Sequence, residues 1–246
     1  FYHIYGFNVV LNLTLHAGAT LVVLPRFNVE EFLRAVQDHS VTTAFLVPPI
    51  VRTLARHPLV ERYDLRSLRY IMSAAAPLPE EIARACADRM GCVIKQAYGL
   101  TETGPTTHWT PRDAVRVNSA GPPVPNTECR VVDVASKRQV PTGELGEIWV
   151  RGPQVMKGYL DNPEVTRRVL DEQGWLHTGD IGYEDADRYI YVIDRANDLV
   201  KFRGLQYQDD ELLLSVVEDR TRRRYDQDRL RFQSLMLDSV RESIVG

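Results

Sequence analysis

Residues 96–108 (QAYGLTETGPTTH) gather side chains that can bind a phosphate group and a divalent cation. Their glycines would let backbone amides approach a phosphate, and Thr101 can donate its hydroxyl hydrogen to a phosphate oxygen. The carboxylate of Glu102 is an oxygen ligand of the kind that Mg²⁺ prefers. A polar loop covered by Tyr98, packed on a sheet, explains the same residues, so this segment alone leaves both interpretations open.

Two later segments carry charged groups beside glycines. In residues 174–180 (GWLHTGD), an aspartate at the end of a strand could bind both hydroxyls of a ribose. An aspartate after Thr-Gly is more often a turn residue that accepts backbone hydrogen bonds. Residues 193–204 (IDRANDLVKFRG) combine acidic and basic groups with a glycine. Taken alone, this third segment favours an ordinary charged surface turn.

Strands must position these segments, and the first third of the sequence has the apolar pattern that is typical of buried strands. Short apolar runs bounded by Gly or Pro predict buried strands at residues 20–25, 43–47, 68–72 and 92–96. With helices between them, these strands predict an α/β fold with a doubly wound, mostly parallel sheet. Ligands bind such sheets beyond the carboxyl ends of the strands, which favours the loops after Met72 and Gln96.

Helix signals lie between the predicted strands. Asn28 is suited to cap a helix whose apolar residues recur on one face, and a second helix is predicted over residues 50–56. Pro79 fits the first turn of a third helix, which Gly91 would end.

The composition of the sequence changes near residue 121. Closely spaced Pro and Gly punctuate short strand-like runs at residues 128–134 and 147–151, which predicts a turn-rich β subdomain. From residue 207 the chain is dense in Asp and Arg and ends in an amphipathic helical pattern. We therefore divide the chain into residues 1–120, 121–194, a short connection over 195–206, and a charged tail over 207–246.

Composition excludes several classes of protein. Over 246 residues, 44% are hydrophobic and 26% charged, and a net charge of -3 gives no reason to expect a nucleic-acid partner. The cysteines and histidines lack the spacing of a disulfide framework or a zinc site, and no apolar run has the length of a membrane span. We expect a cytoplasmic protein. Its start at Phe1, without an initiator Met or signal segment, suggests a fragment of a longer chain.

Taken in order, these motifs resemble those of the adenylate-forming acid–thiol ligases, which include acyl-CoA synthetases, luciferases and peptide-synthetase adenylation domains. The resemblance runs from Phe1 to about Gln206 and is greatest to the 4-coumarate–CoA ligase branch. Its markers are HIYG at 3–6, SAAAP at 73–77, YGLTE at 98–102, GELGEIWVRGPQVMKGYLDNPE at 143–164, GWLHTGDIG at 174–182 and DR…LVKFRG at 194–204.

Members of this family join a carboxylic acid to ATP, release pyrophosphate and transfer the acyl group of the acyl-adenylate to coenzyme A. The resemblance implies an ATP-dependent acid–CoA ligase for an aromatic or medium-chain acid, with ATP or AMP, Mg²⁺ and coenzyme A bound. Residues 1–120 would then be part of the nucleotide- and acyl-binding subdomain. Residues 195–206 would be a hinge, and the C-terminal lid domain of the family would be missing.

The resemblance also implies roles around the nucleotide. Thr101 would bind phosphate and Glu102 would hold Mg²⁺, both acting in catalysis. Tyr98 would stack on adenine. Ala75 and Ala76 would line the purine slot, where small side chains permit close backbone contact.

Other roles that the resemblance implies concern the ribose, the substrate carboxylate and the hinge of the C-terminal domain. Asp180 would bind the ribose hydroxyls with support from Arg195, and Asp194 would be the hinge of the small C-terminal domain. His3 would gate the passage of the substrate carboxylate, although a satisfied core histidine is the simpler interpretation without the motif. Lys201 would contact the acyl-adenylate.

The acyl group would lie among residues from several motifs. Gln206 would contact the acyl-adenylate together with the hinge lysine. Tyr5 would lie in the acyl pocket, where its phenol could meet the para group of an aromatic substrate. Pro105 and Thr106 would form part of the same wall.

The chain departs from the family pattern at several points. Ala74 and Ala97 stand where the family usually has Gly, and in the phenolic branch both positions line the acyl pocket. Two added methyl groups would narrow it, which puts a 4-coumarate-sized acid in doubt. The phosphate loop and the C-terminal catalytic lysine of the family have no counterpart here. We expect the chain alone to adenylate little or nothing, because such electrostatic groups each contribute about 3–4 kcal/mol to transition-state stabilisation.

Two alternatives remain. The first, from a different class, is a non-catalytic nucleotide-binding or interaction module whose tail serves as a partner helix. The second is an adenylation domain that loads a carrier protein instead of coenzyme A. The residues do not determine the oligomeric state.

The departure at Ala97 leads to a prediction for an intact enzyme that carries this segment. Ala97→Gly should widen the range of carboxylic acids accepted, because it removes a methyl group from the acyl pocket. The measurement is coenzyme A ligation across acids of increasing size, with Ala135→Gly, outside the motifs, as the control. An unchanged substrate profile would count against the assignment.

Overall fold

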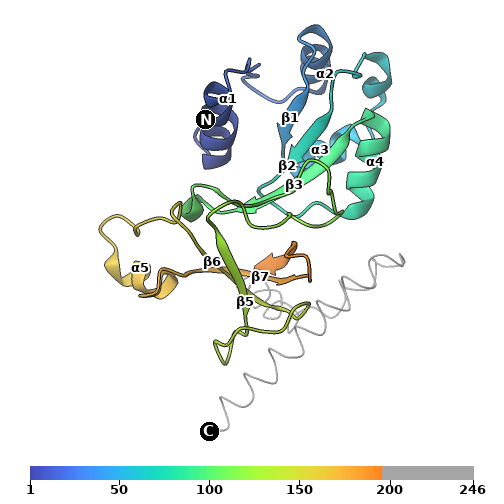
Figure 1. Cartoon of the computed structure of the whole chain (residues 1–246). Helices are drawn as coiled ribbons and strands as arrows, with labels where there is room; N and C mark the ends of the chain where they lie inside the picture. The colour runs from blue at the N-terminus through green and yellow to red at the C-terminus, as the bar shows by residue number, and fades with distance from the viewer. Residues whose placement is uncertain (196–246) are drawn as a thin grey trace, which may run out of the picture.

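The computed structural model describes residues 1–195, and side chains are described up to Ile193. Two four-stranded sheets follow one another along the chain (Figure 1). None of the helices in the described part has the length and hydropathy of a membrane-spanning segment.

The first sheet contains the predicted parallel strands. Its first three strands pair in parallel in chain order, and the fourth runs antiparallel to the third. The strands are β1 (Thr43–Leu46), β2 (Tyr70–Ser73), β3 (Val93–Gly99) and β4 (Thr106–Trp109). A parallel arrangement requires crossover connections, and helices supply them here.

Helices cover both faces of this sheet. They are the π-helix η1 (Tyr5–Asn12), α1 (Leu13–His16), α2 (Val29–Asp38), α3 (Pro48–Leu54), the 3-10 helix η2 (Pro58–Arg62) and α4 (Glu80–Met90). On one face, Ile71 is fully buried in a core with Leu33 of α2 and Leu54 of α3. On the other, the ring of Tyr5 meets that of Phe45 edge-on with centroids 6.3 Å apart. Successive strand residues face opposite sides, so both helix layers reach the same strands.

The helix ends have the signals that the sequence predicts. The Asn28 side chain accepts a hydrogen bond from the Glu31 amide at 3.1 Å, which satisfies a free donor in the first turn of α2. Gly91 ends α4 with a φ of 62°, a left-handed conformation that favours glycine. The predicted α/β class with a mostly parallel sheet is confirmed.

Three expectations about element boundaries were wrong. Residues 20–25 form no strand, and Val23 is 56% exposed, because an apolar run becomes a strand only where another strand pairs with it. Pro48 and Pro49 open α3 instead of closing the preceding strand, since their fixed φ suits a first helical turn. Strand β3 continues three residues beyond residue 96, which puts Ala97 and Tyr98 on a strand and not in a loop.

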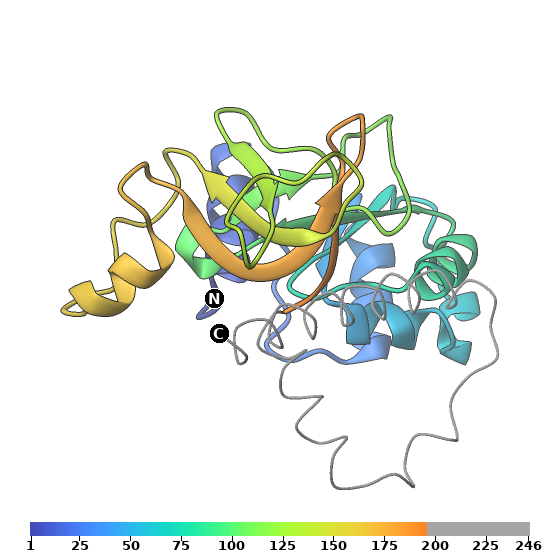
Figure 2. The same cartoon turned by 90° about the horizontal axis from the view of Figure 1, so that it is seen from below.

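The second sheet is antiparallel throughout, as the spacing of Pro and Gly predicts. Its strands are β5 (Glu128–Val132), β6 (Gly146–Arg151), β7 (Leu176–Glu184) and β8 (Ile190–Arg195), with α5 (Pro163–Val169) between β6 and β7. Figure 2 shows β7 as a long, strongly curved strand. The ladder between β7 and β8 shifts register between Ile181 and Gly182. A Cβ added at Gly182 would lie 2.3 Å from the Tyr191 carbonyl oxygen. Bulges of this kind bend a strand.

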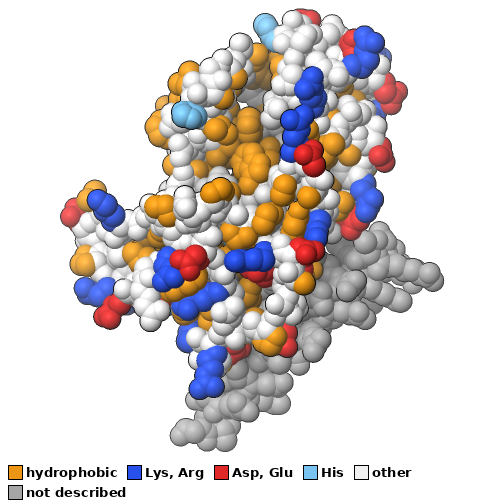
Figure 3. All heavy atoms as spheres, viewed as in Figure 1, with side chains coloured by type: hydrophobic (Ala, Val, Ile, Leu, Met, Phe, Trp, Pro, Cys, Tyr) orange, Lys and Arg blue, Asp and Glu red, His pale blue; other side chains and the backbone are white. Residues whose placement is uncertain are grey.

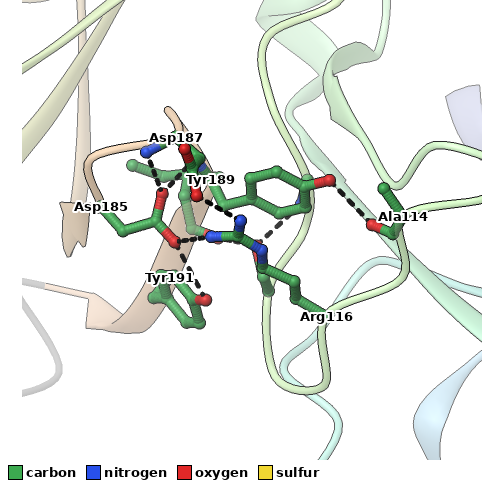
Figure 4. Close-up of polar contacts among 9 residues, drawn as sticks. Ala114, Arg116, Asp185, Asp187, Tyr189 and Tyr191 are labelled. Atoms are coloured by element: carbon green, nitrogen blue, oxygen red, sulfur yellow. Dashed lines mark hydrogen bonds and ion pairs between the residues drawn. The ribbon is translucent and has the colours of Figure 1, made fainter.

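Arg116 connects the segment after the first sheet to the turn between β7 and β8 (Figure 4). Its guanidinium forms ion pairs with Asp185 and Asp187 and lies 4.0 Å from the centre of the Tyr189 ring. The Tyr189 hydroxyl donates to the Ala114 carbonyl at 2.8 Å. These contacts hold β8 against the chain that leaves the first sheet.

His108 on β4 leads to a prediction about stability and pH. It is fully buried, and burial, followed by the charge of Arg188, lowers its pKa from 6.5 to about 3. Between about pH 6.5 and pH 3 the unfolded chain binds a proton at this residue that the folded chain does not. The free energy of unfolding should therefore fall as the pH falls through this window, by up to about 1.4 kcal/mol per pH unit from this residue.

Urea unfolding at a series of pH values tests this. His108→Gln cannot take up the proton, so its free energy of unfolding should fall less steeply below about pH 6.5. The control is His39→Gln, at an exposed position, which should retain the slope of the unchanged chain. Equal slopes for both variants would show that His108 does not contribute.

Candidate functional site

A cavity of about 430 Å³ opens beyond the carboxyl ends of β2 and β3. Its lining comes from four parts of the sequence: residues 3–5, 74–75, 97–106 without 103 and 104, and 178–179. This is the edge of the sheet at which the strand order predicts a ligand site.

The structure brings most of the expected site residues together around this cavity. The lining includes His3, Tyr5, Ala74, Ala75, Ala97, Tyr98, Thr101, Glu102, Pro105 and Thr106. Ala76 is exposed and lies outside the lining. Asp180 also lies outside the cavity lining, but its carboxylate is hydrogen-bonded to the Tyr98 hydroxyl. Lys201 and Gln206 lie outside the described residues.

Five lining residues were not singled out from the sequence: Ile4, Gly99, Leu100, Thr178 and Gly179. Each lies within one of the quoted motifs, and that membership was the available signal. Gly99 has a specific reason to be glycine, because a Cβ there would lie 1.7 Å from the Pro105 carbonyl oxygen. This close approach brings residues 105–106 back against the end of β3.

Tyr98 and Asp180 connect the two sheets at the cavity. The Tyr98 phenol on β3 donates a hydrogen bond of 2.7 Å to Oδ2 of Asp180 on β7. Burial, and then the charge of Asp180, raises the pKa of the Tyr98 phenol well above 10, so the hydroxyl keeps its proton. Asp180 is only 5% exposed. The bond therefore fixes a carboxylate that would be unfavourable if it were buried without partners.

The backbone just before Asp180 takes a left-handed conformation, which hydrogen bonds to neighbouring groups accompany. Gly179 has a φ of 70°, and its amide donates to Oε1 of Glu147 at 3.1 Å. The Asp180 amide donates to the Thr178 hydroxyl at 3.1 Å. On β8, Arg195 is the cross-strand partner of Asp180 and Asp194 is that of Ile181, so the backbones of these predicted residues lie beside the site.

Thr101 and Glu102 lie in the 3-10 turn η3 (Thr101–Thr103), which directly follows β3. The Thr103 hydroxyl accepts from the Leu100 amide at 2.9 Å and lies 2.7 Å from the Pro105 carbonyl, which holds the turn together. The Thr101 side chain is exposed at the cavity. Oε1 of Glu102 accepts a hydrogen bond of 2.8 Å from the Tyr159 hydroxyl.

The chemistry of the site fits a cation held largely by a nucleotide. Among the described residues there is no group of three or more His, Cys, Asp and Glu that could hold a metal alone. Mg²⁺ commonly uses one or two carboxylates together with substrate phosphates, and Glu102 is a carboxylate at the cavity wall. The described residues that line the cavity include no Lys or Arg, so a cation would balance phosphate charge there.

His3 and Tyr5 approach the cavity from the N-terminal segment. His3 is exposed, and its Nδ1 accepts a hydrogen bond of 3.1 Å from the Tyr5 amide. The Tyr5 hydroxyl donates to the Met72 carbonyl at 3.0 Å, and burial raises its pKa above the usual value. Because its hydrogen is used, the Tyr5 oxygen can only accept a hydrogen bond from a ligand.

A second hollow, of about 450 Å³, adjoins the first across Pro105 and Thr106. It lies between η1 and the 103–106 turn, and Asn8 of η1 donates a hydrogen bond to the Gly104 carbonyl. Apolar side chains gather on this side of the molecule, between the N-terminal helices and the first sheet (Figure 3). The two hollows share the wall that the sequence assigned to an acyl group.

Comparisons with known proteins show the family to which the chain belongs. Residues 1–160 match the family model described as AMP-binding enzyme. Over 217 residues the chain is 42% identical to 4-coumarate-CoA ligase 2 of Narcissus pseudonarcissus, covering 86% of this chain and 38% of that protein. It is 40% identical to 4-coumarate–CoA ligase 1 of Petroselinum crispum, covering 86% of this chain and 40% of that protein. The chain thus spans about two fifths of the length of these relatives.

Solved structures lead to the same family. ATP-bound MatB of Rhodopseudomonas palustris matches with a TM-score of 0.75 and 32% identity, over 80% of this chain and 39% of that one. An anthranilate CoA ligase in complex with anthranoyl-AMP matches with a TM-score of 0.73 and 28% identity, over 79% and 38%. With a family model that matches well over half of its residues, this chain belongs to the AMP-binding enzymes, a family of adenylate-forming ligases.

Proposed function

We propose that this chain carries the nucleotide and acyl pocket of an ATP-dependent acid–CoA ligase. The observation that carries the proposal is the meeting of motifs far apart in sequence around one cavity, with Tyr98 bonded to Asp180 at its edge. Residues 1–120 would hold the nucleotide and the acyl group, and residues 121–194 would complete the sugar site. The cytoplasm stays the predicted compartment.

Around the nucleotide, Asp180 would accept hydrogen bonds from the ribose hydroxyls. Because Tyr98 already holds one of its oxygens, the carboxylate needs little reordering when a sugar binds. The Tyr98 ring borders the cavity and would stack on the adenine, next to the small side chain of Ala75. Arg195 would support the same sugar from the neighbouring strand.

For the phosphates, Thr101 would donate its hydroxyl hydrogen and Glu102 would hold Mg²⁺. When bound, the cation would offset the negative charge that otherwise keeps the carboxylate of the substrate away from the phosphate. His3 would lie at the opening through which the carboxylate arrives. Asp194 would be the hinge of a further domain that brings in Lys201 and Gln206.

The acid is proposed to be aromatic or of medium chain length. The names of the similar proteins refer to 4-coumarate and anthranilate, which are aromatic carboxylic acids. Ala74 and Ala97 both lie in the cavity wall, where their methyl groups narrow the space. The Tyr5 oxygen can accept but not donate, so it favours an acid with a hydroxyl or amino group at its far end. Coenzyme A is the proposed acceptor of the acyl group.

Calorimetric titration with AMP tests the nucleotide pocket. We expect the 246-residue chain to bind AMP, and Asp180→Asn to weaken binding by roughly 10- to 100-fold, since a hydrogen bond to a charged group contributes about 1.5–3 kcal/mol. Asp38→Asn, on the exposed end of α2, is the matched control and should bind as the unchanged chain does. Absence of AMP binding, or equal affinity for Asp180→Asn, would contradict the proposal.

Acid-dependent exchange between ATP and pyrophosphate, measured on the same preparations, separates binding from catalysis. AMP binding with little or no exchange is the expected result, because the part of the lining that the structure describes supplies no Lys or Arg for the transferred phosphate. Rapid exchange by this chain would show that the described residues and the tail suffice for adenylation.

A further inference from the structure

The segment that follows β6 folds back onto the turn that carries Glu102. The Met156 amide donates to the Glu102 carbonyl at 2.8 Å, and the Tyr159 hydroxyl donates to Oε1 of the same residue at 2.8 Å. Backbone and side chain of Glu102 are therefore both held by one short stretch of chain. The two partners come from a part of the sequence more than fifty residues later.

Tyr159 lies in a turn that hydrogen bonds to α5 hold in place. Its amide donates to the Thr166 hydroxyl of α5 at 2.9 Å, and the same hydroxyl donates to the Asn162 carbonyl at 2.9 Å. Gly158 has a φ of 150°, and a Cβ there would lie 2.8 Å from Cγ2 of Thr166. The ring is thus presented by a fixed backbone, although Tyr159 is 37% exposed.

The contact occupies one side of the Glu102 carboxylate and leaves the other open. Within residues 1–195, the Tyr159 hydroxyl is the hydrogen-bond partner of Oε1, and Oε2 has no hydrogen bond or ion pair. An ionised carboxylate offers about four lone-pair sites on its two oxygens, so it can keep this bond while Oε2 binds a cation. A free glutamate side chain would have to be ordered before it could bind.

We propose that Tyr159 is a positioning residue that holds the Glu102 carboxylate through Oε1, so that Oε2 is ready for the divalent cation of the nucleotide. The inference rests on the proposed function of the cavity. Groups that hydrogen-bond to a metal-binding side chain orient it, and their loss commonly weakens metal affinity by about 10- to 100-fold. Tyr159 acts through Glu102 and needs no contact with the nucleotide.

The test is Mn²⁺ binding to the 246-residue chain in the presence of ATP, with free Mn²⁺ counted by electron paramagnetic resonance. Mn²⁺ is a suitable probe because it shares the preference of Mg²⁺ for carboxylate oxygen. Tyr159→Phe removes only the hydroxyl and should weaken Mn²⁺ binding by about 10-fold. Its affinity for AMP without a cation should equal that of the unchanged chain, which a general structural defect would not allow.

Two further variants make the outcomes distinct. Glu102→Gln removes the carboxylate charge and should abolish the binding of Mn²⁺ to the chain in the presence of ATP. Tyr63→Phe is the matched control, since its hydroxyl lies against Arg34 on α2, and it should bind Mn²⁺ normally.

Each other result overturns a defined statement. If Tyr159→Phe binds Mn²⁺ normally while Glu102→Gln does not, the inference about Tyr159 is wrong and the proposed function stands. If Tyr159→Phe also loses affinity for AMP without a cation, Tyr159 is a general structural residue and the inference is again wrong. If the unchanged chain and Glu102→Gln bind Mn²⁺ equally, or neither binds it, both the inference and the proposed cation site fail.

Discussion

The hydrogen bond between the Tyr98 phenol and the Asp180 carboxylate joins two sheets that share no strand. Tyr98 lies at the end of β3 in the parallel sheet, and Asp180 lies on β7 of the antiparallel one. A buried carboxylate is unfavourable unless it is hydrogen-bonded, so Tyr98 of the first sheet helps to stabilise Asp180 in its position. Arg116 and its partners hold the turn after β7 against the chain that leaves the first sheet. The cavity lies at the first of these two contacts, where Tyr98 forms part of its wall.

Close backbone approach gives the cavity its shape. Gly99 allows the 105–106 segment to come against the end of β3, and Gly179 takes a left-handed conformation just before Asp180. Glu147 accepts the Gly179 amide and so holds this turn from the adjacent strand. Side chains at these two glycine positions would displace the walls, because one lacks space and the other has a strained φ. The motifs therefore combine residues that line the cavity with residues that let the backbone turn.

The charges of the site are unbalanced in a way that suits a nucleotide with its cation. Glu102 and Asp180 lie at or beside a cavity that, within residues 1–193, is lined by no Lys or Arg. Two carboxylates alone would repel a phosphate, so productive binding of ATP requires positive charge from a cation or from another part of the protein. The hydrogen bond from Tyr159 to Glu102 belongs to the same arrangement, since it orders a carboxylate without cancelling its charge.

Much of this molecule follows from local sequence. Asn28, Gly91 and Pro79 marked helix ends, and apolar runs marked three of the four expected strands, because capping and strand patterning depend on neighbouring residues. The run at residues 20–25 has the same local pattern but no strand to pair with, which its sequence could not reveal. The residue types at 98–102 and 174–180 led to the proposal of a nucleotide site. Only the tertiary structure decided which of those groups meet: Tyr98 and Asp180 are 82 residues apart, and Glu102 and Tyr159 are 57 apart. Hydrogen bonds over such separations form through the packing of whole sheets, and no local propensity encodes them.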